Sequence, residues 1–131
     1  MICADTSVWI AAFRNRGSPQ ARGLEPLLDA RRILLPIPVR LELLAGARGE
    51  QAARLQDLLS FLPLAAPTPA TWRRVEDWLT PIRAAGQRFG FADLLIAALA
   101  ADHDAAVWSL DADFQRLERL GLVRLYVPAR A

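Results

Sequence analysis

Short apolar runs alternate along the chain with longer segments whose apolar residues recur every three or four positions. Short runs rich in Ile, Val and Leu are typical of buried strands, whereas the longer periodicity is typical of helices that pack on one face. The pattern predicts strands at 1–4, 33–37, 62–67, 105–110 and 123–127. It predicts helices at 6–17, 19–32, 38–47, 50–62, 69–87, 92–103 and 112–120, with bends or breaks at Pro26 and Pro81.

Strands that alternate with helices in this way indicate an α/β fold. We expect a three-layer α/β/α arrangement around a mainly parallel central sheet of about four to five strands. The length fits a single domain over residues 1–131. Ligands of such folds bind outside the carboxyl ends of the strands, so the residues that follow each predicted strand are the first candidates for a functional site.

Acidic residues follow two of the predicted strands. Asp5 ends the first strand, and Asp111 and Asp113 come directly after the strand at 105–110. The carboxyl ends of parallel strands meet at one edge of a sheet, so we expect these three carboxylates to share that edge.

Two further acids lie on predicted helices. Glu42 shares a helix face with Val39, Ala45 and Gly46, a face too small and apolar for a typical solvated surface. Asp93 directly precedes the most apolar run of the chain, "LLIAALAA". Both carboxylates are therefore expected to point towards protein.

Each acid has a structural explanation when it is taken alone. An Asp at a helix start accepts hydrogen bonds from free backbone N–H groups, which would account for Asp5, Asp93 and Asp111. Glu42 could pair with a neighbouring arginine. Taken together, however, converging carboxylates repel one another unless a cation lies among them. With one cysteine and one histidine in the chain, a Cys/His zinc cluster is excluded, and oxygen ligands favour Mg²⁺ or Mn²⁺.

All 16 basic residues are arginines, and the sequence pI is near 9.5. Arginine offers a planar fork of donors that suits phosphate, so a nucleic-acid partner is compatible with this composition. A coding bias towards Ala, Arg, Leu and Pro explains the same composition equally well. No apolar run reaches the roughly 18 residues of a membrane span, so we expect a cytoplasmic protein without membrane contact.

Four segments resemble the acidic motifs of PIN-domain ribonucleases. They are "ICADTSVWI" around Asp5, "PVRLELLAG" around Glu42, "FADLLIAALA" around Asp93 and "SLDADF" from Ser109 to Phe114. Their order and spacing are most similar to those of the VapC toxins of bacterial type II toxin-antitoxin pairs. The resemblance covers almost the whole chain.

The resemblance implies a metal-dependent endoribonuclease that inhibits growth or translation unless its antitoxin binds it. Asp5, Glu42, Asp93 and Asp111 would be catalytic and would hold Mg²⁺, or Mn²⁺, with Asp113 as a further metal ligand and Asp111 the favoured fourth acid. The bound ions would activate a water for in-line attack on the RNA backbone and stabilise the leaving oxygen.

Hydroxyl and arginine side chains complete the expected site. Thr6, Ser7 and Ser109 would position a water or the acids, although a hydroxyl at a helix start is equally expected for Thr6 and Ser7. Many family members carry Thr where this chain has Ser109, and Ser keeps the hydroxyl. The candidate RNA-binding residues are Arg14, Arg16 and Arg88.

The expected partners follow from the same resemblance: an RNA substrate, a cognate VapB-like antitoxin and a second copy of the chain in a homodimer. The alternative is a PIN-fold module that binds nucleic acid or protein without cleaving it. An α/β phosphatase is a weaker alternative, since Ser7 stands where its second Asp belongs. The sequence names neither the RNA, nor the antitoxin, nor the number of metal ions.

Overall fold

The computed structural model describes residues 1–129. Helices dominate the chain, and the strands are short. In chain order the elements are β1 (Ile2–Ala4), α1 (Thr6–Arg14), α2 (Pro19–Asp29), β2 (Leu35–Pro36), α3 (Ile37–Gly46), α4 (Gly49–Ser60), β3 (Leu64–Ala65), α5 (Pro69–Ala84), α6 (Phe91–Asp102), β4 (Ala106–Trp108) and α7 (Ala112–Arg119).

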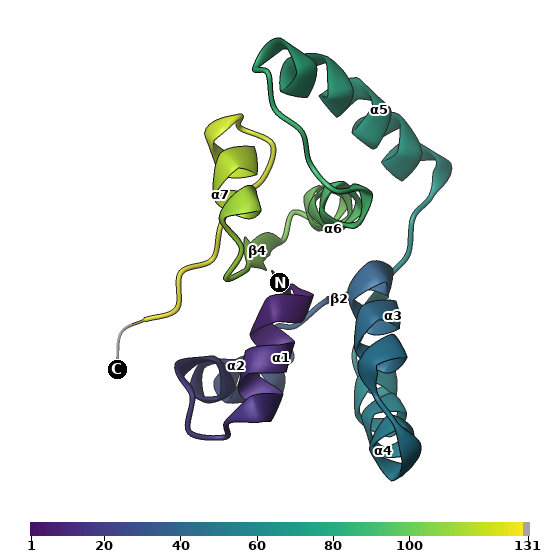
Figure 1. Ribbon diagram of the computed structural model, residues 1–131, viewed down its shortest axis with the longest axis vertical. Coiled ribbons are helices and arrows are strands. Elements are labelled where there is room, and N and C mark those ends of the chain that lie inside the picture. The colour runs from purple at the N-terminus through teal and green to yellow at the C-terminus, as the bar shows by residue number, and fades with distance from the viewer. Residues whose placement is uncertain (130–131) are drawn as a thin grey trace.

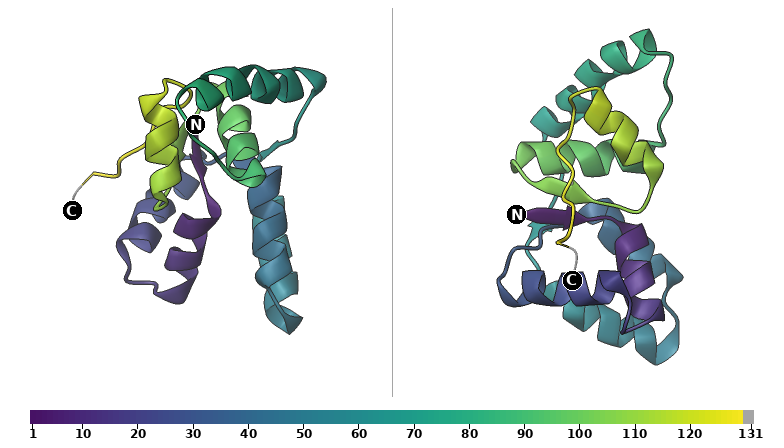
Figure 2. Two further views of the ribbon diagram at one scale, coloured as in Figure 1. Left: turned by 45° about the horizontal axis from the view of Figure 1, so that its top comes forward. Right: turned by 90° about the vertical axis from the view of Figure 1, so that its left-hand side faces the viewer.

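The strands are parallel, as predicted. β1 pairs with β4, and β2 pairs with β3. A parallel bridge between Ile2 and Ile33 joins the two pairs, so the order across the sheet is β3, β2, β1, β4. Helices lie on both sides of these strands, with α1 and α2 on one side and α6 with α5 on the other (Figures 1 and 2). The predicted α/β class is therefore confirmed.

The fifth predicted strand, 123–127, is present only as a bridge. Leu125 pairs with Val107 of β4, and Tyr126 N–H donates to the Val107 carbonyl at 2.8 Å. The segment follows β4 along its free edge, but its pairing is too short to count as a strand. Sequence alternation alone does not determine how many residues of such an edge segment pair with their neighbour.

The core forms around α6, whose residues 94–100 are all buried. This helix contacts β1, β2 and β4 and covers one face of the sheet, which explains why it is apolar all round. Trp9 and Phe114, each at most 1% exposed, are the largest fully buried side chains. Among residues 1–129 no helix is long and apolar enough to cross a membrane.

Side chains cap the starts of α1 and α2. Asp5 caps α1, and Ser18 caps α2 by accepting from Ala21 N–H at 3.1 Å. Pro26 and Pro81 lie inside α2 and α5, yet each helix is assigned as continuous through its proline. The predicted break at these two prolines is therefore wrong, and the predicted bend stays a prediction.

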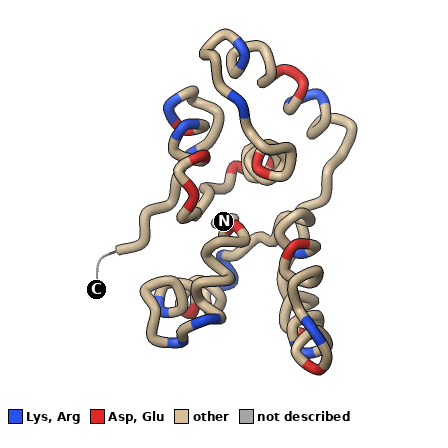
Figure 3. Tube along the Cα trace, in the orientation of Figure 1, with Lys and Arg blue, Asp and Glu red and all other residues tan. Residues whose placement is uncertain are grey.

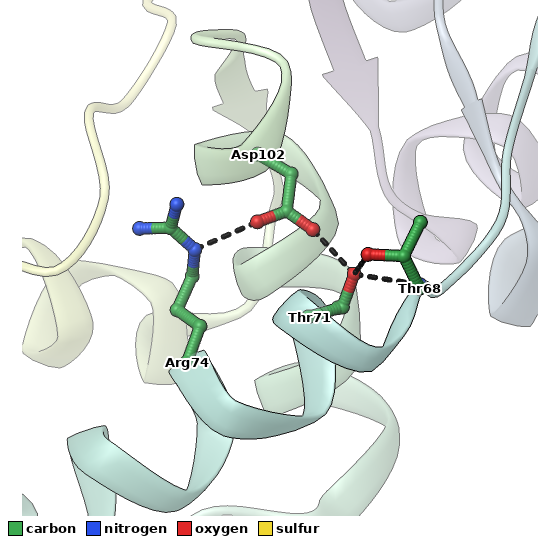
Figure 4. Close-up of polar contacts among 4 residues, drawn as sticks. All are labelled: Thr68, Thr71, Arg74 and Asp102. Carbon is green, nitrogen blue, oxygen red and sulfur yellow. Dashed lines mark hydrogen bonds and ion pairs between the residues drawn. The ribbon is translucent and has the colours of Figure 1, made fainter.

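A polar network fixes α5 on α6 (Figure 4). The hydroxyl of Thr71, a fully buried residue, donates to Asp102 Oδ2 at 2.5 Å. Arg74 Nε donates to the other oxygen of the same carboxylate at 2.7 Å. Thr71 also accepts from the backbone N–H of Thr68 at 3.0 Å, so the start of α5 and the end of α6 share one network.

Replacing Asp102 with Ala should lower the free energy of unfolding by about 1–3 kcal/mol, because the buried Thr71 hydroxyl loses its acceptor. Arg74→Ala should cost only about 0–1 kcal/mol, since the Arg74 side chain is 40% exposed and water screens its ion pair. Urea unfolding of both variants measures the difference. A cost for Arg74→Ala as large as that for Asp102→Ala would contradict this ranking.

Candidate active site

The strand order places the candidate site at one point of the sheet edge. From β1 the chain crosses to β2 on one side, and it returns much later to β4 on the other side. Such a reversal leaves a crevice outside the carboxyl ends of the two central strands. Asp5 follows β1 and Ser109 follows β4, so both lie at this crevice, and acidic positions from several elements gather there in Figure 3.

Asp5 is the most buried of the candidate acids, with 5% of its surface exposed. Its Oδ1 accepts from Ser7 N–H at 3.1 Å and from Val8 N–H at 3.4 Å, so it caps α1 as predicted. Burial raises the pKa of Asp5, and hydrogen bonds from Ser109, Ser7 and the backbone oppose that rise. Capping of α1 therefore fixes the orientation of the Asp5 carboxylate, and the same carboxylate can still take part in the site.

Two serines connect the turn after β1 to the turn after β4. Ser7 Oγ donates to Asp5 Oδ1 at 2.5 Å and accepts from Leu110 N–H at 3.0 Å. Ser109 Oγ donates to Asp5 Oδ2 at 2.6 Å and accepts from Asp111 N–H at 2.9 Å. Both oxygens of Asp5 are thus held by residues that also fix the loop carrying Asp111.

Three aspartates from two elements form the closest cluster. One carboxylate oxygen from each of Asp93, Asp111 and Asp113 lies within 4.8 Å of the other two. Asp111 caps α7 by accepting from Asp113 N–H at 2.9 Å, as predicted. Asp93 does not cap α6: Gly90 takes that position with extended backbone, and Asp93 is the third helical residue. Its carboxylate is therefore free to face the cluster.

The negative charge of this cluster affects the pKa of Asp93. Burial, followed by repulsion from Asp111, Asp113, Asp5 and Glu42, raises the pKa of Asp93 to about 6. All five predicted acids are thus close enough to interact. Carboxylates that repel one another, without Cys or His among them, make a donor set that suits a hard divalent cation.

Glu42 was predicted from its sequence pattern to point towards protein, and the structure does not confirm this. It is exposed on α3, and its neighbours Ala45 and Gly46 are exposed as well. The prediction that these positions face protein is therefore wrong. Small residues on one face of a helix do not show that another element packs against that face. Among residues 1–129 Glu42 makes no ion pair with an arginine, so the structural pairing considered for it is not present there.

Arg116 was not among the residues predicted from the sequence. Its guanidinium pairs with Asp113 Oδ1 at 2.7 Å, donates to the side chain of Gln87 and to the Arg88 carbonyl, and lies 4.3 Å from the centre of the Phe89 ring. The three-residue spacing between Asp113 and Arg116 could have predicted their ion pair, since such residues are neighbours on a helix. The loop contacts could not be read from the sequence, since they join distant segments.

The remaining candidates lie at different distances from the acids. The hydroxyl oxygen of Thr6 is buried without a hydrogen-bond partner among residues 1–129. Arg88 is exposed, and its backbone carbonyl accepts from Arg116, the residue that pairs with Asp113. Arg14 and Arg16 are exposed at the far end of α1, about 13 Å along the helix from Asp5. The structure places the backbone of Arg88 near the cluster, through Arg116, and leaves Arg14 and Arg16 remote from it.

The raised pKa of Asp93 predicts a pH-dependent stability difference. The unfolded chain releases this proton near pH 4, whereas the folded protein holds it to about pH 6. The stabilising contribution of the protonated form is therefore complete below about pH 4 and is lost as the pH rises through about 6. Urea unfolding of metal-free protein should show Asp93→Asn gaining stability over wild type across this window. A gap that stays constant with pH would contradict this assignment.

Comparison with known proteins identifies the family. Residues 2–120 match the PIN domain family. The chain is 35% identical over 125 residues to a VapC ribonuclease of Mycobacterium bovis, Mb1587, covering 92% of this chain and 93% of the relative. Ribonuclease VapC11 of Mycobacterium tuberculosis (strain H37Rv) matches with the same identity and the same coverage.

Solved structures share the fold. VapBC2 from Rickettsia felis, bound to a DNA fragment from its promoter, superposes with a TM-score of 0.76 at 21% identity, covering 96% of this chain and 98% of that one. VapC20 of Mycobacterium tuberculosis, a toxin described as cleaving the sarcin-ricin loop, gives 0.67 at 18% identity over the full length of both chains. The matched residues contain the whole acidic cluster, and the chain belongs to the PIN-domain family of VapC ribonucleases.

Proposed function

We propose that the chain is a metal-dependent endoribonuclease that acts as the toxin of a VapBC pair. The observation that carries the proposal is the cluster of Asp93, Asp111 and Asp113, in which burial and then repulsion from Asp111, Asp113, Asp5 and Glu42 raise the pKa of Asp93. Mg²⁺ is the proposed ion, with Mn²⁺ as a substitute, because both take oxygen ligands and bind phosphate.

The five acids have different roles in this proposal. Asp93 and Asp111 would hold the ion together with Asp5 and Glu42. Asp111 is favoured over Asp113 because the Asp113 carboxylate is already paired with Arg116. A bound divalent ion supplies Lewis-acid stabilisation of the reacting phosphate and lowers the pKa of water.

The hydroxyl groups position these acids. Ser7 and Ser109 hold Asp5 from both sides, and Ser109 also accepts from the Asp111 backbone, which keeps two acids in register. Thr6 follows Asp5, and its buried hydroxyl has no hydrogen-bond partner within residues 1–129, so we propose that it binds a water beside the site. Positioning of this kind usually changes metal affinity or activity by about 10- to 100-fold.

The arginines would bind the RNA backbone. Arg88 would bind the phosphate nearest the cut, since its backbone contacts Arg116 beside the cluster and its side chain is exposed. Arg14 and Arg16, at the far end of α1, suit phosphates further along the strand. These contacts would orient the RNA without reading its bases.

A small antitoxin is the proposed partner. The similar solved structures include VapBC complexes from Rickettsia felis and from nontypeable Haemophilus influenzae. By analogy, we propose that a VapB-like antitoxin binds this chain and blocks its activity, that the toxin forms a homodimer, and that it acts on RNA in the cytoplasm.

Incubation of the purified, antitoxin-free protein with total cellular RNA and Mg²⁺ or Mn²⁺ tests the nuclease proposal. We expect discrete fragments from wild type and none from Asp5→Asn, which keeps the size of the side chain but removes its charge. A binding module would retain RNA on a filter, leave it intact and bind equally well as Asp5→Asn. That second result would overturn the proposal.

A further inference from the structure

A cavity of about 230 Å³ opens next to the acidic cluster. Its walls come from the end of β4, the start of α2, α7 and the segment 125–128. Ser109 and Asp111 line this cavity and also belong to the candidate active site. A group held in the cavity would therefore lie beside Asp111, the acid of the cluster that lines it.

The cavity offers amide groups and the ring of the half-buried Tyr126, which the buried Trp108 supports. Trp108 and Tyr126 meet edge to face in its wall, with ring centres 5.6 Å apart and planes at 65°. Gln20 and Gln115 add side-chain donors and acceptors from opposite elements. Among the described residues that line it there is no arginine, so the cavity suits a neutral planar group better than a phosphate.

The aromatic wall is held in place by the fold. Trp108 is 3% exposed, and its ring lies against α2 at Gly23. A side chain at Gly23 would place its Cβ 2.7 Å from the Trp108 ring, so the helix can approach this closely only with glycine there. The wall therefore exists before any ligand binds, which reduces the entropic cost of binding.

We propose that this cavity binds one nucleobase of the RNA, next to the phosphate that is cut. The inference rests on the proposed ribonuclease function and adds a specificity site to it. A phosphate at Asp93 and Asp111 leaves the adjoining base within reach of the cavity, where aromatic surface and amide groups are the usual means of binding single-stranded bases. Gln20 and Gln115 would select the base by its hydrogen-bonding edge.

A randomised single-stranded RNA pool tests the proposal with the full-length protein. Wild type, Gln20→Ala, Gln115→Ala and Tyr126→Leu are compared with Gln56→Ala, a matched control on the exposed side of α4. Sequencing of the cleaved ends gives the base preference at each position beside the cut. Sequencing of the RNA retained by the non-cleaving Asp93→Asn protein, alone and combined with each cavity variant, gives the preference for binding. Thermal unfolding shows which variants are folded.

The expected result is a base preference at one position beside the cut that falls by at least about fivefold in the cavity variants and is kept in Gln56→Ala. An active wild type whose preference is the same in all folded variants overturns the nucleobase site and leaves the nuclease intact. If wild type cuts nothing, the nuclease proposal fails. The base preference of the retained RNA then tests the cavity: a preference lost in the cavity variants supports the nucleobase site, and an unchanged preference overturns it. Variants that lose only antitoxin binding would assign the cavity to a peptide and also overturn the proposal.

Discussion

Asp93→Asn should lower the rate of RNA cleavage by about 100- to 1,000-fold while the protein stays folded. A metal ion contributes several kcal/mol of transition-state stabilisation, and each 1.36 kcal/mol corresponds to a tenfold change in rate. Asp93 clusters with Asp111 and Asp113, so the loss of its charge would remove one of the three closest oxygen donors of the proposed ion site. The initial rate of cleavage of a single RNA, under saturating Mn²⁺, measures the effect.

The stability of the same variant separates a catalytic role from a structural one. Because burial and repulsion from neighbouring acids both disfavour its charge, Asp93→Asn should unfold at a temperature equal to or above that of metal-free wild type at neutral pH. Asp57→Asn, an exposed change on α4, is the matched control and should keep full activity. Wild-type cleavage by folded Asp93→Asn would remove this residue from the proposed mechanism.

Ser109→Ala should reduce cleavage by about 10- to 100-fold, whereas Ser109→Thr should retain most of it. The hydroxyl donates to Asp5 and accepts from the Asp111 backbone, so its loss releases both acids from their common geometry. Threonine supplies the same hydroxyl.

The metal dependence of these variants shows how Ser109 acts. If the serine positions the acids, the Mn²⁺ concentration for half-maximal cleavage should rise in Ser109→Ala and stay near the wild-type value in Ser109→Thr. A loss of thermal stability alone, with unchanged metal dependence, would show that the residue only supports the fold. Equal activity of the Ala variant and wild type would contradict the positioning role.

The sequence predicted the parts of the site that follow directly from chain order. Asp5 and Asp111 could be placed at one sheet edge because parallel strands end together, and the structure brings Asp93 and Asp113 to Asp111. Capping by Asp5 and Asp111 was also predictable, since each comes immediately before a helix. These features need only the order of strands and helices.

Features that depend on packing between distant segments could not be predicted in the same way. The exposure of Glu42 depends on what covers its helix face, and the small residues beside it do not determine that. Arg116 is held by contacts with the loop at 87–89. The cavity brings Gln20 together with Tyr126 from the other end of the chain. Such relations arise only when the chain is folded.

Removal and return of the metal ion tests the central claim most directly. Wild-type protein is treated with EDTA, and cleavage of an RNA that it cuts is then followed as Mg²⁺ or Mn²⁺ is added in excess. The account predicts that cleavage stops in EDTA and returns with either ion at an unchanged cut site. Undiminished cleavage in EDTA, by protein shown to be free of metal, would contradict a site built from these carboxylates to hold a divalent ion.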